Sequence, residues 1–296
     1  MIKITFKQIL TVALVSGCVV LFAMCANAQT NPQKPAKYES PDWEDKIVPS
    51  SPLTVFEMAR LLLPDLKTNP EKSTEYIASD LKRIRLIGGV SETGMEIDTE
   101  GNEKHEISSP DYFWLKDGDR SLLVLVFTVD SIQSVIALFK TTPAVALLDA
   151  GTMAQDMHVS VEREKVYTIG SGHQAFTVVC WHDNSSESFD HFTFVSVVDQ
   201  KLKAIAVPGA YTGFSTYSQA RQRMCKQSTS PKFQFAPTPG NGYYDLIVSE
   251  STIKACHRDS EEWSWKTGIV FQRTVNRRWH WDPRRKQYRM MAAAKR

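Results

Sequence analysis

The side chains best suited to chemistry lie together in the segment CWHDNSSESFDHF, which begins at Cys180. It contains two histidine–aspartate neighbours in mirrored order, His182 with Asp183 and Asp190 with His191. A thiolate and two imidazoles are zinc ligand types, and a catalytic zinc site needs three protein ligands. The segment is therefore a candidate metal site, with Cys180, His182 and His191 as ligands. It is also a candidate acid–base site of a hydrolase, with His182, Asp183 and His191 as catalytic residues.

The elements around this segment decide whether these side chains can meet. Apolar runs on both sides of the polar loop 184–187 predict a β-hairpin that places Cys180 opposite His191. Alternation then puts His182 on the same face as these two residues and Asp190 on the other face. We expect the second face to be core because it carries the aromatic residues Trp181, Phe192 and Phe194. A one-residue slip would reverse the faces, and the spacing matches no zinc signature, so a polar hairpin end without a metal is the first interpretation.

Other enzyme signatures are absent from the sequence. There is no G-x-S-x-G, H-E-x-x-H, P-loop or dinucleotide fingerprint. Ser171 lies in a glycine-rich turn next to a histidine, but a nucleophile needs a base that only the fold can bring near it. The sequence therefore favours a non-enzymatic protein without a cofactor.

The C-terminal segment TVNRRWHWDPRRKQYRMM has the most unusual charge distribution. The whole chain has 35 Lys and Arg against 33 Asp and Glu, but Asp282 is the single acid from residue 266 to the end. Basic residues interleaved with aromatic residues can bind a polyanion. The candidate binding residues are Arg277, Arg278, Trp279, Trp281, Arg284, Arg285, Lys286 and Tyr288.

Three interpretations of this segment remain open. It forms a closing hairpin whose aromatics cover the core, or it binds an anionic envelope component or an acidic protein surface, or it faces the acidic segment 92–106 of the same chain. We do not expect nucleic acid as the partner, because the N-terminus predicts export. A closing hairpin is the first interpretation of the segment itself. For the whole chain we expect a non-enzymatic binding module of the bacterial envelope, and this hairpin is its first candidate binding surface.

The N-terminus resembles a secretory leader. A basic start, a short apolar run and an A-x-A end predict a signal peptide over residues 1–28, with cleavage after Ala28. The motif LVSGC offers an alternative, a lipid-modified Cys18 that would tether the chain to a membrane. We therefore expect a periplasmic or secreted protein, or a lipid-anchored one. Residues 29–50 are rich in Pro, Lys, Glu and Ser and predict a flexible linker.

Loss of the leader leaves three cysteines, which is an odd number. An oxidising compartment permits disulfides. Cys180 lies in an apolar strand pattern, where a free buried thiol is common. Cys225 and Cys256 lie in polar surroundings, so we predict a disulfide between these two residues.

The fold class expected from the pattern is α+β, as a single domain over residues 51–296 with a possible sub-boundary near 107. Helices are expected over 52–63 and, more weakly, over 69–80, and the stretch 132–148 fits either a helix or a strand. Short polar turns between later apolar runs predict an antiparallel meander or sandwich. The expected strands are 82–87, 112–115, 122–128, 157–163, 165–169, 174–182, 189–198, 202–207, 243–249, 268–281 and 287–291.

Overall fold

The computed structural model describes most of the chain after the predicted leader. The described residues are 39–72, 74–89, 103–108, 110–154, 158–184, 186–218, 223–238, 242–258, 264 and 268–291. They belong to one compact unit, Ala36–Arg296. The leader, Cys18 and residues 90–102 of the acidic segment lie outside the described residues.

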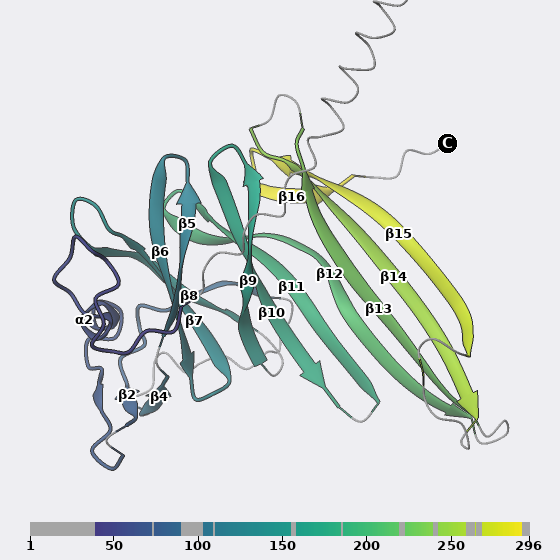
Figure 1. The fold of residues 1–296 in the computed structure, drawn as a ribbon, viewed down its shortest axis with the longest axis horizontal. Coiled ribbons are helices and arrows are strands. Elements are labelled where there is room, and N and C mark those ends of the chain that lie inside the picture. Colours follow the sequence, from purple (N-terminus) through teal and green to yellow (C-terminus); the bar gives the residue numbers. More distant parts are fainter. Residues whose placement is uncertain are drawn as a thin grey trace, which may run out of the picture. The chain divides into compact units, whose positions relative to one another are not determined.

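The described residues form one β-sheet, in which every pairing but one is antiparallel (Figure 1). It starts with β1 (Lys67–Thr68), β2 (Tyr76–Ala78), β4 (His105–Ile107), β6 (Arg120–Val129) and β5 (Asp111–Asp117). It continues with β10 (His173–Asp183), β11 (Glu187–Val198), β12 (Lys201–Ser218), β13 (Arg223–Ala236), β14 (Asp245–Arg258), β15 (Ile269–Asp282) and β16 (Gln287–Met290). The branches are β7 (Gln133–Lys140), β8 (Ala146–Ala154), β9 (His158–Gly170) and β3 (Arg85–Gly89), which is parallel to β8.

Helical structure is limited to one short helix in the described part of the chain, α2 (Val55–Arg60). The sequence predicted a helix over 52–63, but Thr54 is the N-cap because its hydroxyl accepts the backbone N–H of Glu57 at 3.2 Å. The second expected helix, over 69–80, is wrong, since β2 occupies its end and pairs with β4. The described fold is thus predominantly antiparallel β, and no described helix is long and apolar enough to cross a membrane.

The ambiguous stretch 132–148 forms β7 and the start of β8. Every residue of β7 except Lys140 is buried, which explains why its sequence shows no alternation between apolar and polar residues. One face of β6 and β7 packs against α2 and the segment before it, where Trp43 and Val48 are buried. Residues 39–50, expected to be a flexible linker, therefore contribute to the core.

Two further clusters of buried residues lie beyond this one. The first covers the other face of β6 and β7 and includes Phe176, Cys180 and Val195. The second includes Phe194 and Phe235 and extends to the C-terminal hairpin, where Trp281 and Tyr288 are buried. The central strands are therefore covered on both faces, and the C-terminal hairpin is fixed to the sheet by its own aromatic residues.

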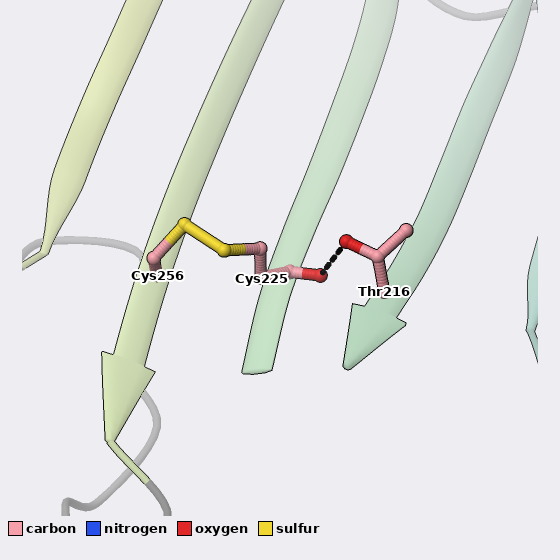
Figure 2. Close-up of a disulfide and its surroundings, with 3 residues drawn as sticks. All are labelled: Thr216, Cys225 and Cys256. Atoms are coloured by element: carbon pink, nitrogen blue, oxygen red, sulfur yellow. Dashed lines mark hydrogen bonds between the residues drawn. A yellow bond between two sulfur atoms is a disulfide. The ribbon is translucent and has the colours of Figure 1, made fainter. Parts of the chain in front are cut away.

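Strands β12 to β15 run side by side and are the longest of the sheet (Figure 1). No part of β13 was expected from the sequence, and β12 continues well beyond the expected strand 202–207. Cys225 on β13 and Cys256 on β14 are directly opposite each other and form the predicted disulfide (Figure 2). The bond closes a segment of 31 residues. A disulfide of this kind is typical of a compartment more oxidising than the cytosol, so we place the folded chain outside the cytosol.

Candidate functional site

The C-terminal hairpin is anchored by two of the residues that the sequence singled out for binding. Trp281 and Tyr288 face each other across β15 and β16 and are only 9 % and 3 % exposed. The Tyr288 hydroxyl donates to the carbonyl of Tyr244 at 2.8 Å, and the ring of Tyr243 stacks on Trp281 at 4.1 Å. These aromatics cover the core, so Trp281 and Tyr288 support the hairpin and cannot form its contact surface.

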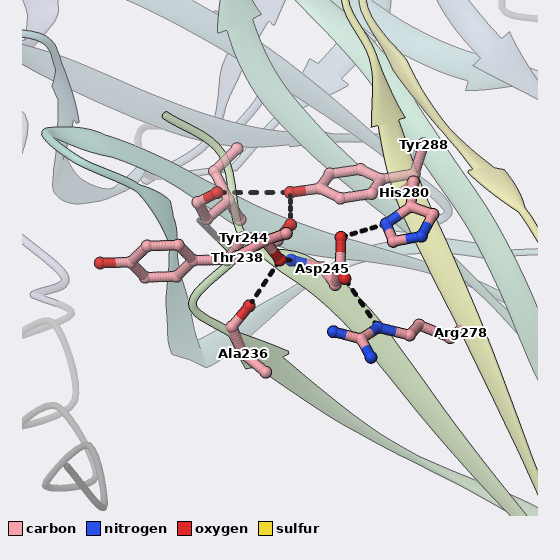
Figure 3. A network of polar contacts seen from close by, with 8 residues as sticks. Ala236, Thr238, Tyr244, Asp245, Arg278, His280 and Tyr288 are labelled. Atoms are coloured by element: carbon pink, nitrogen blue, oxygen red, sulfur yellow. Dashed lines mark hydrogen bonds and ion pairs between the residues drawn. The ribbon is translucent and has the colours of Figure 1, made fainter. Parts of the chain in front are cut away.

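A buried carboxylate on β14 binds the side chains of Arg278 and His280 on β15 (Figure 3). Asp245 on β14 has a side chain that is 2 % exposed, and it accepts a 2.6 Å hydrogen bond from Nε of Arg278 and a short one from Nδ1 of His280. Burial alone would raise the pKa of Asp245, but hydrogen bonds from His280, Thr238 and Arg278 outweigh it and the pKa is lowered. Arg278 is thus already neutralised by a fixed partner.

Other cations of the hairpin also have carboxylate partners. Arg277 pairs with Glu250 at 3.1 Å, and Lys286 pairs with Asp199. Arg289 lies 3.5 Å from Asp282. Trp279 is partly buried at the margin of the core. The excess of basic residues in the sequence therefore overstates the positive charge that this hairpin offers to a partner.

The turn between β15 and β16 is where exposed charge remains. One carboxylate oxygen of Asp282 accepts the backbone N–H groups of Arg284 at 3.0 Å and Arg285 at 3.2 Å, the pattern of an aspartate that caps a turn. The N–H group of Arg285 and that of Arg284 lower the pKa of Asp282, so it stays ionised. Both arginine side chains are exposed, and among the described residues neither guanidinium forms a hydrogen bond or ion pair.

A second turn, between β11 and β12, contacts the first. Asp199 and Gln200 both have positive φ values, 53° and 64°, as in the two-residue turns that join antiparallel strands. Asp199 pairs with Lys286, and Nζ of Lys203 donates to the carbonyl of Arg285 at 2.7 Å. We call the resulting surface the two-turn cation cluster. It consists of Lys201, Lys203, Arg284, Arg285 and Lys286.

Sequence reasoning missed Lys201 and Lys203, because they precede Arg285 by more than 80 positions. The turn at Asp199 and Gln200 could be recognised from its residue types. Its contact with the C-terminal hairpin depends on how the strands are arranged in the folded sheet. No local pattern carries that information.

The hairpin that suggested a metal site has the expected register. Cys180 is opposite His191, and His182 is opposite Phe189. The expected assignment of the faces is wrong at this end, however. Cys180 is buried in a core cluster, whereas Trp181 is 38 % exposed and stacks on His158 at 4.2 Å.

The chemistry of this hairpin is accordingly weak. Burial raises the pKa of the Cys180 thiol to about 11, which keeps it protonated and unreactive as a ligand or nucleophile. The ring of His182 stacks on Phe189 at 4.9 Å, and burial lowers the pKa of His191. Asp183 is exposed at the loop. In the described part of the chain, no group of three His, Cys, Asp or Glu side chains is arranged to hold a metal ion.

The two-turn cation cluster thus brings together basic side chains from two turns that are far apart in the sequence. No protein-family model, no curated protein and no solved structure matches this chain.

Proposed function

We propose that this protein is an exported, non-enzymatic binding module that docks on an anionic component of the bacterial envelope through the two-turn cation cluster. The observation that carries the proposal is the meeting of two turns that together present five cationic side chains beside two carboxylates, Asp199 and Asp282. Phosphate and carboxylate groups of lipid headgroups or envelope glycans have the matching charge. The predicted leader and the disulfide support an extracytosolic location for such a contact.

Preorganisation makes this surface suitable for binding. Asp282 fixes the backbone at Arg284 and Arg285, and Lys203 holds the carbonyl of Arg285. The turn is therefore ordered before a ligand arrives, which reduces the entropy lost on binding. The guanidinium groups themselves stay exposed, and guanidinium groups can bind phosphate or carboxylate in a bidentate manner.

Charge reversal tests the proposal. We expect Arg284→Glu with Arg285→Glu to weaken binding to vesicles that contain phosphatidylglycerol by at least about tenfold, because each cation near an anionic surface contributes about 1 kcal/mol. A matched control is Lys67→Glu with Lys82→Glu, which changes the net charge equally at two exposed positions that are not part of the cluster. Binding of wild type should fall steeply between low salt and about 0.15 M salt.

Two arms of the experiment distinguish the source of the anionic group. Retention on heparin but not on vesicles assigns the cluster to an acidic glycan, and the reverse result assigns it to a lipid surface. Binding that is insensitive to salt and equal in the cluster variant and the control variant would contradict the proposal.

A further inference from the structure

Among the described strands, none pairs with the outer edge of β15 over most of its length. β15 pairs with β14 from Ile269 to Trp279, whereas β16 pairs only with the last part of β15, from Trp279 to Asp282. No other described strand borders β15 on that side. A long open edge can pair with another chain through its free N–H and C=O groups. We propose that the edge between Phe271 and Arg277 binds an extended acidic segment of a partner protein as an additional antiparallel strand.

The direction of the backbone groups on β15 follows from the pairing of β13 with β14. The Cα atoms of Cys225 and Cys256 are 4.1 Å apart, the spacing of a non-hydrogen-bonded pair, so Cys256 directs its backbone groups toward β15. In agreement, the N–H of Cys256 donates to the carbonyl of Gly268 at 2.9 Å. Every second residue of β14 has the same direction.

Alternation then separates the β15 residues into two sets. Those that bond to β14 through their backbone are Phe271, Arg273, Val275 and Arg277. Those that direct their backbone groups outward are Gln272, Thr274 and Asn276. Arg278 belongs to the outward set and supports this assignment, because its carbonyl accepts the N–H of Met291 on the outer side at 2.9 Å. The edge thus offers donor and acceptor groups at the spacing of an antiparallel ladder.

The side chains beside this edge define what an added strand should carry. Phe271 is exposed, as are Ile269 and Val270 before it. Arg273 and Arg277 lie on the same face as Phe271, and β15 has no acid before Asp282. Directly opposite residues of neighbouring strands interact most strongly. Arg277 is already paired with Glu250. A strand that alternates acidic and apolar residues on one face would therefore pair an acid with Arg273 and apolar groups with Phe271 and Val275.

A second copy of the chain is a poorer occupant of this edge. Opposite charges in directly opposite positions of neighbouring strands stabilise their pairing. Pairing of two β15 strands about Thr274 would put Arg273 opposite Val275 and Arg277 opposite Phe271, so neither arginine would face an acid. Since β15 has no acid before Asp282, charge favours an acidic partner over self-association.

The experiment measures binding of a synthetic peptide of about eight residues, a common strand length, by fluorescence anisotropy. The peptide carries an acid opposite Arg273 and branched apolar residues opposite Phe271 and Val275. We expect Thr274→Pro to weaken binding by about tenfold or more, because it removes an outward N–H without removing a bond to β14. Thr274→Ala is the matched control, since both variants lose the contact between the Thr274 hydroxyl and Ser251. The alanine variant should bind within about twofold of wild type.

A charge exchange completes the test. Arg273→Glu should weaken binding of the acidic peptide, and a peptide with lysine at the opposite position should restore it. The proline variant should still bind anionic vesicles like wild type, because the two-turn cation cluster is a separate surface and this result also shows that the variant is folded. Equal peptide binding by the proline and alanine variants would overturn the proposal. Concentration-dependent dimerisation through the edge, with no peptide binding, would also overturn it.

Discussion

Nζ of Lys203 donates a 2.7 Å hydrogen bond to the carbonyl of Arg285. This bond connects the start of β12 to the turn between β15 and β16. The bond positions an exposed arginine through its backbone and leaves the guanidinium available. Lys203 therefore has two roles in the two-turn cation cluster, as a charge and as a support for the neighbouring turn.

Replacement of Lys203 should separate these two roles. We expect Lys203→Met to weaken binding to anionic vesicles by about threefold more than Lys201→Met, which removes the same charge but no described hydrogen bond. Because the bond is exposed, unfolding free energy should change by less than about 1 kcal/mol. Vesicle titration and urea unfolding measure the two effects. Equal affinities of the two variants would show that Lys203 acts through its charge alone.

The buried carboxylate of Asp245 predicts a dependence of stability on pH. Its pKa is lowered in the folded state, so its contribution is fully present above the pKa of an unfolded aspartate, about 3.9, and is lost as pH falls through the lower folded pKa. We expect Asp245→Asn to reduce the free energy of unfolding at pH 7 by about 1–2 kcal/mol, a modest value because Arg278 is 52 % exposed. The difference from wild type should shrink as pH falls below about 3.9.

Urea unfolding at several pH values measures this effect. Asp119→Asn is the control, since Asp119 is exposed in a turn and should change stability by less than about 0.5 kcal/mol. A difference between Asp245→Asn and wild type that grew in acid would contradict the assignment of Asp245 as an ionised anchor.

The disulfide between Cys225 and Cys256 should stabilise the long strands. A closed segment of 31 residues corresponds to about 3–4 kcal/mol from the reduced entropy of the unfolded chain. We therefore expect Cys225→Ser with Cys256→Ser to lower the urea midpoint, and a reductant to lower wild type to the same value. Cys180→Ala serves as the control because it retains the sensitivity to reductant. A wild-type midpoint unchanged by complete reduction would refute this role.

The segment before α2 should matter for stability, because Trp43 packs against Tyr76 with ring centroids 4.5 Å apart. We expect Trp43→Ala to reduce the free energy of unfolding by about 3–5 kcal/mol, the range for a large buried aromatic residue. Glu44→Ala, at the exposed neighbouring position, should change it by less than about 0.5 kcal/mol. Equal stability of the two variants would restore the interpretation of this segment as a linker.

Local patterns were sufficient for some features of this fold. The register of the hairpin at Cys180 and His191 followed from two apolar runs and a short polar loop. The disulfide followed from the contrast between two cysteines in polar surroundings and one in an apolar strand. Both predictions depend on residues close to the feature itself or on the immediate surroundings of each cysteine.

Other features depend on contacts that no local pattern contains. β13 was missed because most of its residues are at least partly exposed, and its first part, 223–231, lacks the alternation between apolar and polar residues that marks a half-buried strand. Trp181 was placed in the core because it is aromatic, whereas the cluster around Cys180 covers the opposite face. The two-turn cation cluster could not be predicted, because Lys203 and Arg285 are far apart in the sequence and come into contact only in the folded sheet.

The position of Cys225 opposite Cys256 also has a consequence for how the sheet is assembled. A slip of β13 against β14 by one residue would put the two sulfurs on opposite faces, and a slip by two would move their Cα atoms beyond bridging distance. β13 and β14 carry many small polar residues, whose pattern specifies register only weakly. The disulfide can therefore form only in chains whose strands β13 and β14 are already paired in the native register, and it then prevents them from shifting to another register.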